Sequence, residues 1–301
     1  MCKVIVAGSI NMDIVATTKY HPKNGETVFG SNLKYFPGGK GANQAIASSK
    51  LGAKTVMIGK VGDDPFGTQL VDFLKQQNVE TSILIEKDTS TGIALITVAE
   101  ENSDNTIVVI SGANFLLTEK DIENIEFEKG DVLISQFEIP TKTIEAFFAR
   151  GKKIGTINIF NPAPAQSIST NLLSLIDILV LNETELSFIS GVTINASDEE
   201  SILQAIQKLN NSHINVVITL GEKGVLAFHG NERIRILGKK VQAVDSTGAG
   251  DCFVGALAAS ILSGKSFSDS LTFANFAASI SVTKEGAGSS MPTLEEVEKK
   301  L

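Results

Sequence analysis

The residues best suited to chemistry in this chain are Asp245 to Asp251, which read D-S-T-G-A-G-D. The apolar residues within 241–244 predict a strand before them, and an amphipathic helical pattern follows, with Gly264 as a stop signal. At such a helix start several backbone N–H groups lack a helical partner, and with the helix dipole they bind anions. A carboxylate repels a resting anion, but it can accept the proton of a hydroxyl group that attacks a bound phosphorus atom. The motif predicts a kinase that acts on an alcohol, with Asp251 as general base.

Other interpretations of these glycines are a plain Asp-capped turn or a better-known nucleotide motif. The phosphate-binding pattern G-x-x-x-x-G-K-[ST] is absent, because Lys40 follows a glycine but Gly41 comes next. The dinucleotide pattern G-x-G-x-x-G fails at its third glycine, where Phe253 stands. A tight turn remains open, since glycine-rich turns between strands and helices are common.

Composition narrows the class of protein. The chain has 301 residues, of which 43% are hydrophobic, enough for one large core or a main domain with a small appendage. A net charge of −8 argues against nucleic acid or an anionic membrane as a partner. Its two cysteines suggest neither a disulfide framework nor a metal site. No apolar run reaches the length of a membrane span and the first residues do not resemble a signal peptide, so we expect a cytoplasmic protein.

Helical and strand patterns alternate along most of the chain. Apolar runs predict strands at 4–7, 56–58, 132–135, 154–159, 178–181 and 216–220, and helices are expected at 42–51, 65–77, 141–150, 183–190 and 198–209. Continuous apolar runs are typical of strands buried on both faces. The alternation predicts an α/β fold with a doubly wound, mostly parallel sheet flanked by helices.

Two stretches, 11–37 and 91–110, lack helical periodicity and suggest short strands at 27–29, 34–36, 93–98 and 106–110. We expect them to form a small β-sheet lid, separate from a main domain made of 1–10, 38–90 and 111–301. Such an appendage can exclude water from phosphoryl transfer or serve as a dimer interface.

Further polar residues follow predicted strands or open a predicted helix. The segment 38–45 reads G-G-K-G-A-N-Q-A, where glycines allow close backbone approach and Lys40 and Asn43 suit a polyhydroxylated ligand. Asn11 and Asp13 follow the first strand and could face one sugar together if the backbone is extended there. A glycine-rich hinge and a simple turn are the corresponding plain interpretations. Other strand-end polar residues gather on the same rim of the sheet, where ligands of open α/β sheets bind: Glu138, Asn161, Asn182, Glu185 and Thr219.

These motifs together resemble the ribokinase-like sugar kinase family. The matching segments are G-G-K-G-A-N-Q-A, N-P-A-P-A, N-E-T-E, T-L-G-x-x-G and D-S-T-G-A-G-D, in the family's order, and the resemblance runs from Val4 to about Pro292. It implies the ribokinase-like fold and ATP-dependent phosphorylation of D-ribose at O5, giving D-ribose 5-phosphate. It also implies Mg²⁺, a monovalent cation such as K⁺, and dimers formed through the lids.

The resemblance assigns roles residue by residue. The transferring phosphoryl group would meet Asp251 as base and an anion hole formed by Gly248, Ala249 and Gly250. The sugar-binding positions are Asn11, Asp13, Gly39, Lys40, Asn43 and Glu138. The nucleotide-binding positions are Asn182, Thr219, Gly221, Gly224, Gly250 and Asn275, and Glu185 is tied to Mg²⁺ and phosphate placement. The cation would be held by side-chain or main-chain oxygens of Asp245, Thr247, Ser281, Lys284, Gly286 and Ser290.

Several alternatives stay open or are disfavoured. Deoxyribose differs from ribose by one hydroxyl, which changes the pocket by roughly 1–3 kcal/mol, so a deoxyribokinase stays possible. A nucleoside kinase should sandwich a base between aromatic residues, and the lid stretches offer few. A sugar-phosphate kinase needs extra basic residues, but 91–110 contains no Lys or Arg. A non-catalytic sugar sensor would lack an intact base or anion hole, and this chain keeps both motifs.

Overall fold

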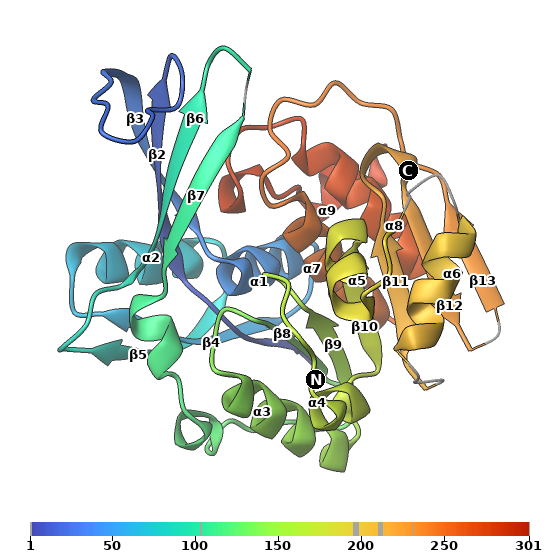
Figure 1. Cartoon of the computed structure of the whole chain (residues 1–301). Coiled ribbons are helices and arrows are strands. Elements are labelled where there is room, and N and C mark those ends of the chain that lie inside the picture. The colour runs from blue at the N-terminus through green and yellow to red at the C-terminus, as the bar shows by residue number, and fades with distance from the viewer. Residues whose placement is uncertain (1, 103, 195–198, 210–212, 231, 301) are drawn as a thin grey trace.

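The structure is a computed structural model that describes residues 2–102, 104–194, 199–209, 213–230 and 232–300. Within these residues, one sheet has nine strands in the order β13-β12-β11-β10-β9-β8-β1-β4-β5 (Figure 1). The strands from β11 to β5 run parallel, and β12 and β13 extend the sheet as antiparallel strands. Their bounds are β1 Val4–Ala7, β4 Thr55–Gly62, β5 Glu80–Glu86, β8 Val132–Gln136, β9 Ile157–Asn161, β10 Ile178–Asn182, β11 Asn215–Thr219, β12 Val225–His229 and β13 Glu232–Ile236.

Helices cover both faces of this sheet. Side chains alternate between the two faces along β1. Val4 and Val6 belong to a hydrophobic cluster that includes residues of α1, α7 and α8. Ile5 and Ala7 belong to a second cluster, on the other face, that includes residues of α3 to α6. The helices are α1 Lys40–Lys50, α2 Pro65–Gln76, α3 Thr141–Ile154, α4 Thr170–Leu175, α5 Glu183–Ser190, α6 Glu199–Lys208, α7 Ala249–Leu262, α8 Phe267–Ser281 and α9 Leu294–Glu298. The doubly wound, mostly parallel architecture predicted from the alternation is confirmed.

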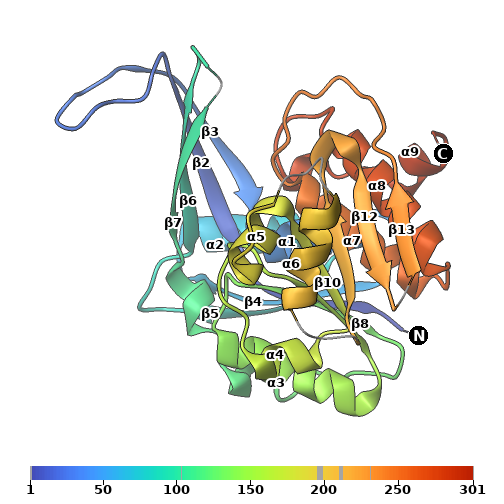
Figure 2. The ribbon, with the colours of Figure 1, turned by 45° about the vertical axis from the view of Figure 1, so that its right-hand side comes forward.

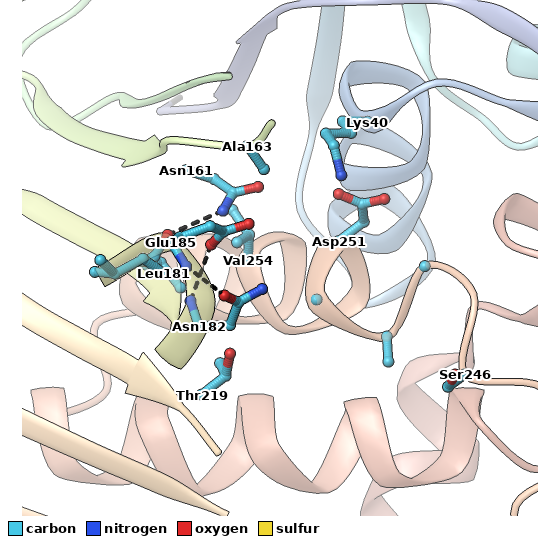
Figure 3. Close-up of a pocket in the computed structure, with 14 residues that line it drawn as sticks. Lys40, Asn161, Ala163, Leu181, Asn182, Glu185, Thr219, Ser246, Asp251 and Val254 are labelled. Atoms are coloured by element: carbon cyan, nitrogen blue, oxygen red, sulfur yellow. Dashed lines mark hydrogen bonds between the residues drawn. The ribbon is translucent and has the colours of Figure 1, made fainter. Parts of the chain in front are cut away.

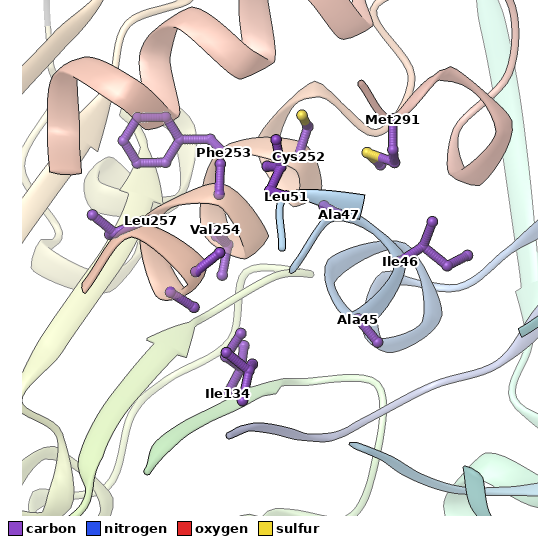
Figure 4. Close-up of a cluster of buried hydrophobic side chains, with 14 of the residues drawn as sticks. Ala45, Ile46, Ala47, Leu51, Ile134, Cys252, Phe253, Val254, Leu257 and Met291 are labelled. Carbon is purple, nitrogen blue, oxygen red and sulfur yellow. The ribbon is translucent and has the colours of Figure 1, made fainter. Parts of the chain in front are cut away.

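Helix α7 lies inside the molecule. It packs between α1 and α8, and its residues from Asp251 to Ser260 are all buried. The pattern was therefore wrong in suggesting an amphipathic helix with a single apolar stripe. Figure 4 shows α7 and α1 side by side, and Val254 of α7, Ala47 of α1 and Ile134 of β8 belong to one buried cluster. This packing fixes the start of α7, where the glycine motif lies, against the start of α1.

A second sheet has four strands in the order β3-β2-β6-β7, and we call it the lid sheet. Its strands are β2 Asn11–Thr18, β3 Gly30–Gly38, β6 Gly92–Ala99 and β7 Asn105–Ile110. Figure 2 shows the lid sheet projecting from the body of the molecule, which is covered by helices. Strands β2 and β6 begin next to the body and run away from it. Asp64 ties its base to the body, because its carboxylate accepts bonds from Gly67 N (2.8 Å), Thr91 N (2.7 Å) and the Thr91 hydroxyl (2.7 Å).

Several element predictions need correction. Residues 241–244 form no strand: Val241 and Val244 are exposed, and the backbone there joins the body through Val244 N to Val282 O (2.8 Å). Residues 27–29 are also not a strand. The pattern missed β2 as a strand because its first residues are polar, and it missed β5, β12 and β13. The predicted helix at 198–209 corresponds to α6, but residue 198 lies outside the described residues. No described helix is long and apolar enough to cross a membrane.

Candidate active site

A pocket of about 190 Å³ lies beyond the carboxyl ends of β9, β10 and β11. Figure 3 shows side chains from these strands on one side, with Lys40 and Asp251 on the other. Most of the polar residues predicted to bind nucleotide and phosphate line it. Its lining consists of Lys40, Asn161, Ala163, Val180, Leu181, Asn182, Glu185, Thr219, Ser246, Gly248, Ala249, Gly250, Asp251 and Val254.

The glycine motif begins α7 at the wall of this pocket. Gly248 is the N-cap residue with φ 74°, a left-handed conformation that glycine adopts without strain, and within the described residues no side chain caps this helix end. A Cβ atom added at Gly250 would have no described heavy atom within 4 Å beyond its own helix turn. The helix start therefore offers an open approach to backbone N–H groups, as an anion-binding site requires.

Asp251 is buried at this helix start, and both its carboxylate oxygens accept hydrogen bonds from amides of α1. Asn43 Nδ2 donates to Oδ2 (3.1 Å), and Gln44 Nε2 donates to Oδ1 (2.9 Å). The Lys40 amine points toward Asp251 (Figure 3). Burial lowers the pKa of Lys40, but the charges of the surrounding carboxylates, Asp251 first and then Glu138, outweigh burial and raise it. Lys40 is therefore a permanent cation beside a carboxylate.

Asn11 and Asp13 lie on the extended strand β2, so they share one face of the lid sheet, as expected for residues two apart. Asn11 Oδ1 accepts a bond from Asn114 Nδ2 (2.7 Å). The Asp13 carboxyl is buried, and this burial, followed by the charges of Glu138 and Asp251, raises its pKa to about 7, although Lys40 opposes the shift. The plain interpretation of Asn11 and Asp13 as turn residues is wrong.

Glu138 follows β8 and meets the start of α1. Its Oε2 accepts hydrogen bonds from the Ser9 hydroxyl and from Lys40 N (3.3 Å), while Ser9 Oγ accepts a bond from Gly41 N (3.3 Å). Gly39 has φ 89°, and a Cβ atom there would lie 2.7 Å from Asn11 N. These close contacts bring 38–45 against β2, so that the carboxylates of Asp13 and Glu138 interact with Lys40.

Asn182 and Glu185 begin α5 as a reciprocal cap. Asn182 Oδ1 accepts a bond from Glu185 N (2.8 Å), and Glu185 Oε2 accepts one from Asn182 N (2.9 Å). Burial raises the pKa of Glu185, and the bond from Asn182 N and the charge of Lys40 only partly offset this. The Glu185 carboxyl group therefore lies at the pocket wall with a raised pKa, and a cation bound beside it would lower that pKa.

Comparison with known proteins shows the family to which this chain belongs. The model of the pfkB family of carbohydrate kinases matches residues 1–294. The chain belongs to the pfkB family of carbohydrate kinases. It is 42% identical over 295 residues to the ribokinase of Haemophilus influenzae, with 97% of this chain and 95% of that protein covered. It is 35% identical over 299 residues to the deoxyribokinase of Salmonella typhi, with 97% and 96% covered.

Solved structures agree. The ribokinase of Arabidopsis thaliana, in a complex with ribose and ATP, superposes with a TM-score of 0.86 at 32% identity, covering 99% of this chain and 98% of that one. The expected ribokinase-like fold is confirmed, and this carbohydrate kinase is a phosphotransferase. The alternatives of a dinucleotide enzyme and of a non-catalytic scaffold have no such support.

In this carbohydrate kinase, three residues predicted to bind nucleotide lie outside the lining of the pocket. Gly221 and Gly224 flank a short turn after β11, where Gly224 has φ 90°. Asn275 of α8 donates from Nδ2 to Leu237 O (3.0 Å). The pocket therefore ends at Thr219, and the turn and α8 lie beyond it.

Apart from Ser281, the last residue of α8, the predicted cation residues lie on two segments that Asp245 joins. Its carboxylate accepts bonds from Thr247 N (2.9 Å) and Gly286 N (2.9 Å). Burial raises the pKa of Asp245, but these bonds outweigh burial and lower it, so the carboxylate stays charged. The other side chains point to partners of their own: Ser281 to Ala278 O (2.9 Å), Ser290 to Ala287 O (2.7 Å) and Lys284 to Glu296 (2.7 Å).

Sequence reasoning missed residues that support the kinase site from behind. Ser9 holds Glu138, Asn114 holds Asn11 and the backbone of Ile10 (2.9 Å), and Gln44 holds Asp251. Nothing in the motif at 38–45 distinguishes Gln44 as a partner of Asp251. Its partners come from distant parts of the chain, so no sequence pattern signals them.

Proposed function

We propose that this carbohydrate kinase transfers the γ-phosphoryl group of ATP to O5 of D-ribose, giving D-ribose 5-phosphate. One observation carries the proposal: Asp251 lies at the open start of α7 with Lys40 and the Asn11, Asp13 and Glu138 cluster beside it. A candidate general base, backbone N–H groups that can bind a phosphate, and side chains that can bind hydroxyl groups thus lie close together. The relatives named ribokinase, and one solved with ribose and ATP, support ribose as the acceptor.

The sugar would lie between the lid sheet and α1, held by Asn11, Asp13, Gly39, Lys40, Asn43 and Glu138. Among the described residues, buried Asn43 Oδ1 has no hydrogen-bond partner, so it can accept a bond from a sugar hydroxyl. Asp251 would take the O5 proton as the oxygen attacks phosphorus in line. The N–H groups of Gly248, Ala249 and Gly250 would bind the charge that develops on the transferring group.

ATP would occupy the pocket and continue past its end. Asn182, Glu185 and Thr219 line the phosphate side, and Gly221, Gly224 and Asn275 would hold the nucleoside beyond it. An amide oxygen and a carboxylate at Asn182 and Glu185 suit Mg²⁺, which is held by few protein oxygens together with phosphates. The charged Asp245 and the hydroxyl and carbonyl oxygens of Thr247, Ser281, Lys284, Gly286 and Ser290 suit K⁺, because the Lys284 amine is paired elsewhere with Glu296. When bound, these cations supply positive potential at the transferring phosphoryl group.

We also propose that residues 11–37 and 91–110 act as the lid and as a homodimer interface. Directly opposed residues of four adjacent strands make one apolar row on the lid sheet: Tyr35, Ile14, Leu95 and Val108. Tyr35, Leu95 and Val108 are exposed, with 50%, 43% and 61% of their surface accessible. A contiguous apolar face of this kind is typical of an interaction surface.

The test is ATP consumption, with Mg²⁺ and K⁺ present, on D-ribose, 2-deoxy-D-ribose, fructose and adenosine in parallel. The proposal predicts that kcat/KM is highest for ribose. A higher kcat/KM for 2-deoxyribose would make the protein a deoxyribokinase and leave the mechanism intact. No turnover of any of the four would refute the proposed substrate class.

A further inference from the structure

Three side chains, those of Asn161, Gln44 and Gln136, form a connected hydrogen-bond network behind Asp251. Asn161 Nδ2 donates to the main-chain oxygen of Val180 (2.9 Å), and Asn161 Oδ1 accepts a bond from Gln44 Nε2 (3.2 Å). The same Gln44 nitrogen donates to Asp251 Oδ1 (2.9 Å), and Gln44 Oε1 accepts a bond from Gln136 Nε2 (2.6 Å). Gln44 and Gln136 are fully buried, and Asn161 and Asp251 nearly so.

The main-chain oxygen of Val180 fixes the direction of every bond in this network. A carbonyl oxygen can only accept, so Asn161 must turn its nitrogen to Val180 and its oxygen to Gln44. Gln44 must then present its nitrogen to Asn161, and its second N–H is directed at Asp251. If the Gln44 amide were turned over, its oxygen would face two acceptor oxygens, Asn161 Oδ1 and Asp251 Oδ1. Its nitrogen would then face Gln136 Nε2, which is itself a donor. The fold therefore presents a hydrogen-bond donor to Asp251.

The donor matters because acidic groups surround Asp251. The titratable groups that interact with it are Lys40 of α1, Asp13 of β2, Glu185 of α5 and its neighbour Cys252, and Glu138 lies with Asp13 and Lys40. Lys40 is the cation of this group. Nearby carboxylates favour protonation of a carboxyl group, whereas hydrogen bonds donated to a carboxylate favour its charged form. Asn43 and Gln44 each donate one amide hydrogen bond to Asp251, so both carboxylate oxygens are held in place.

We propose that Gln44 is a positioning residue for phosphoryl transfer, which orients the Asp251 carboxylate through the hydrogen-bond network anchored at Val180. This inference rests on the proposed role of Asp251 as the general base. Gln44 is fully buried and does not line the described pocket, so we expect it to contact neither the substrates nor the transferring group. Its loss should therefore change turnover and its pH dependence while leaving the binding of sugar and ATP nearly as before.

The test is Gln44→Glu, a nearly isosteric change that places a second carboxyl group against Asp251. Two carboxyl groups in contact share one proton, so Asp251 would stay protonated to higher pH. We expect kcat at pH 7 to fall about tenfold or more, and the acidic midpoint of the kcat–pH profile to rise by about one pH unit or more. The KM values for sugar and ATP should change by less than about threefold, and activity should recover at alkaline pH.

The matched control is Ser48→Ala, one turn later on α1. Ser48 is buried at the same helix contact, with Oγ 2.9 Å from Gln44 O and 3.0 Å from Gly255 O of α7, but it does not touch Asp251. This variant should lose stability and keep the wild-type pH profile. If Gln44→Glu does not fold, Gln44→Met removes the donor at similar volume and should lower kcat with unchanged KM values.

The outcomes separate this inference from the proposed function. An unmoved acidic midpoint in Gln44→Glu, in an enzyme that loses its turnover in Asp251→Asn, would overturn the role of Gln44 and leave the base in place. A shifted midpoint in Ser48→Ala would also overturn it, because loosened helix packing would then explain the effect. Full turnover in Asp251→Asn would instead refute the proposed base itself.

Discussion

Adding one methyl group at Gly250 should stabilise the protein and strongly reduce its turnover. Gly250 is exposed in the first turn of α7, and a Cβ atom there would contact no described heavy atom within 4 Å beyond its own helix turn. Ala in a helix is favoured over Gly by roughly 0.5–1 kcal/mol, so Gly250→Ala should raise the free energy of unfolding by up to about 1 kcal/mol. In a chain of this size that gain corresponds to about 2 °C in Tm.

The same methyl group would occupy the space where we place the γ-phosphoryl group. The phosphoryl group would then lose its close approach to the backbone N–H groups of 248–250. Removing one such donor in comparable sites costs roughly 10²–10³ in kcat, which is about 3–4 kcal/mol. Gly250→Ala should therefore show a kcat reduced by about that factor.

Thermal unfolding and steady-state kinetics on one preparation provide the assay. Ser268→Ala serves as the control, since Ser268 is exposed on α8 and does not line the pocket. The control should keep full activity. A Gly250→Ala enzyme with wild-type kcat would refute the assignment of the 248–250 backbone as an anion hole, because its methyl group would then have no phosphoryl group to obstruct.

Three further predictions concern the lid sheet and its base. Asp64→Ala removes the α2 cap and leaves Thr91 N–H unpaired, so urea unfolding should show a loss of about 2–3 kcal/mol. Because the bonds to Asp64 outweigh its burial and lower its pKa, that difference should shrink as the pH falls below about 4; a pH-independent difference would contradict it. The pKa of Asp13 is raised from 3.8 to about 7, chiefly by burial, so its ionisation destabilises the free fold as the pH rises through this window. Asp13→Asn should therefore stabilise the protein more at pH 8 than at pH 4, by up to about 4 kcal/mol, and equal effects at both pH values would refute the shift. Leu95→Lys and Val108→Lys together should convert a dimer into monomers in light scattering, and an unchanged dimer mass would exclude this face as the interface.

Much of the architecture is predictable because burial leaves a periodic signal. Strands such as β10 are continuous apolar runs, and Gly264 follows α7 as expected. Failures occur where this signal is overridden. Val241 and Val244 resemble a strand but stay exposed in a loop, and β2 hides its strand character because it carries the polar residues of the site.

The site itself is predictable only in part. Residues next to strand ends or helix starts, such as Asp251 and Glu138, can be found because topology brings those ends together. The direction of the bonds behind Asp251 cannot be found this way. Gln44, Gln136 and Asn161 come from three elements, and their orientation depends on one main-chain oxygen in a fourth.

The most direct test of the proposed reaction is to identify its product by NMR and to compare the wild type with Asp251→Asn. The wild type should convert ATP and D-ribose into ADP and a sugar whose phosphate is coupled to C5. Asp251→Asn should bind ribose with similar affinity and lower kcat by about 10²–10⁴, the usual share of a positioned base. A phosphate at another position, or near-normal turnover by Asp251→Asn, would contradict the mechanism proposed for this site.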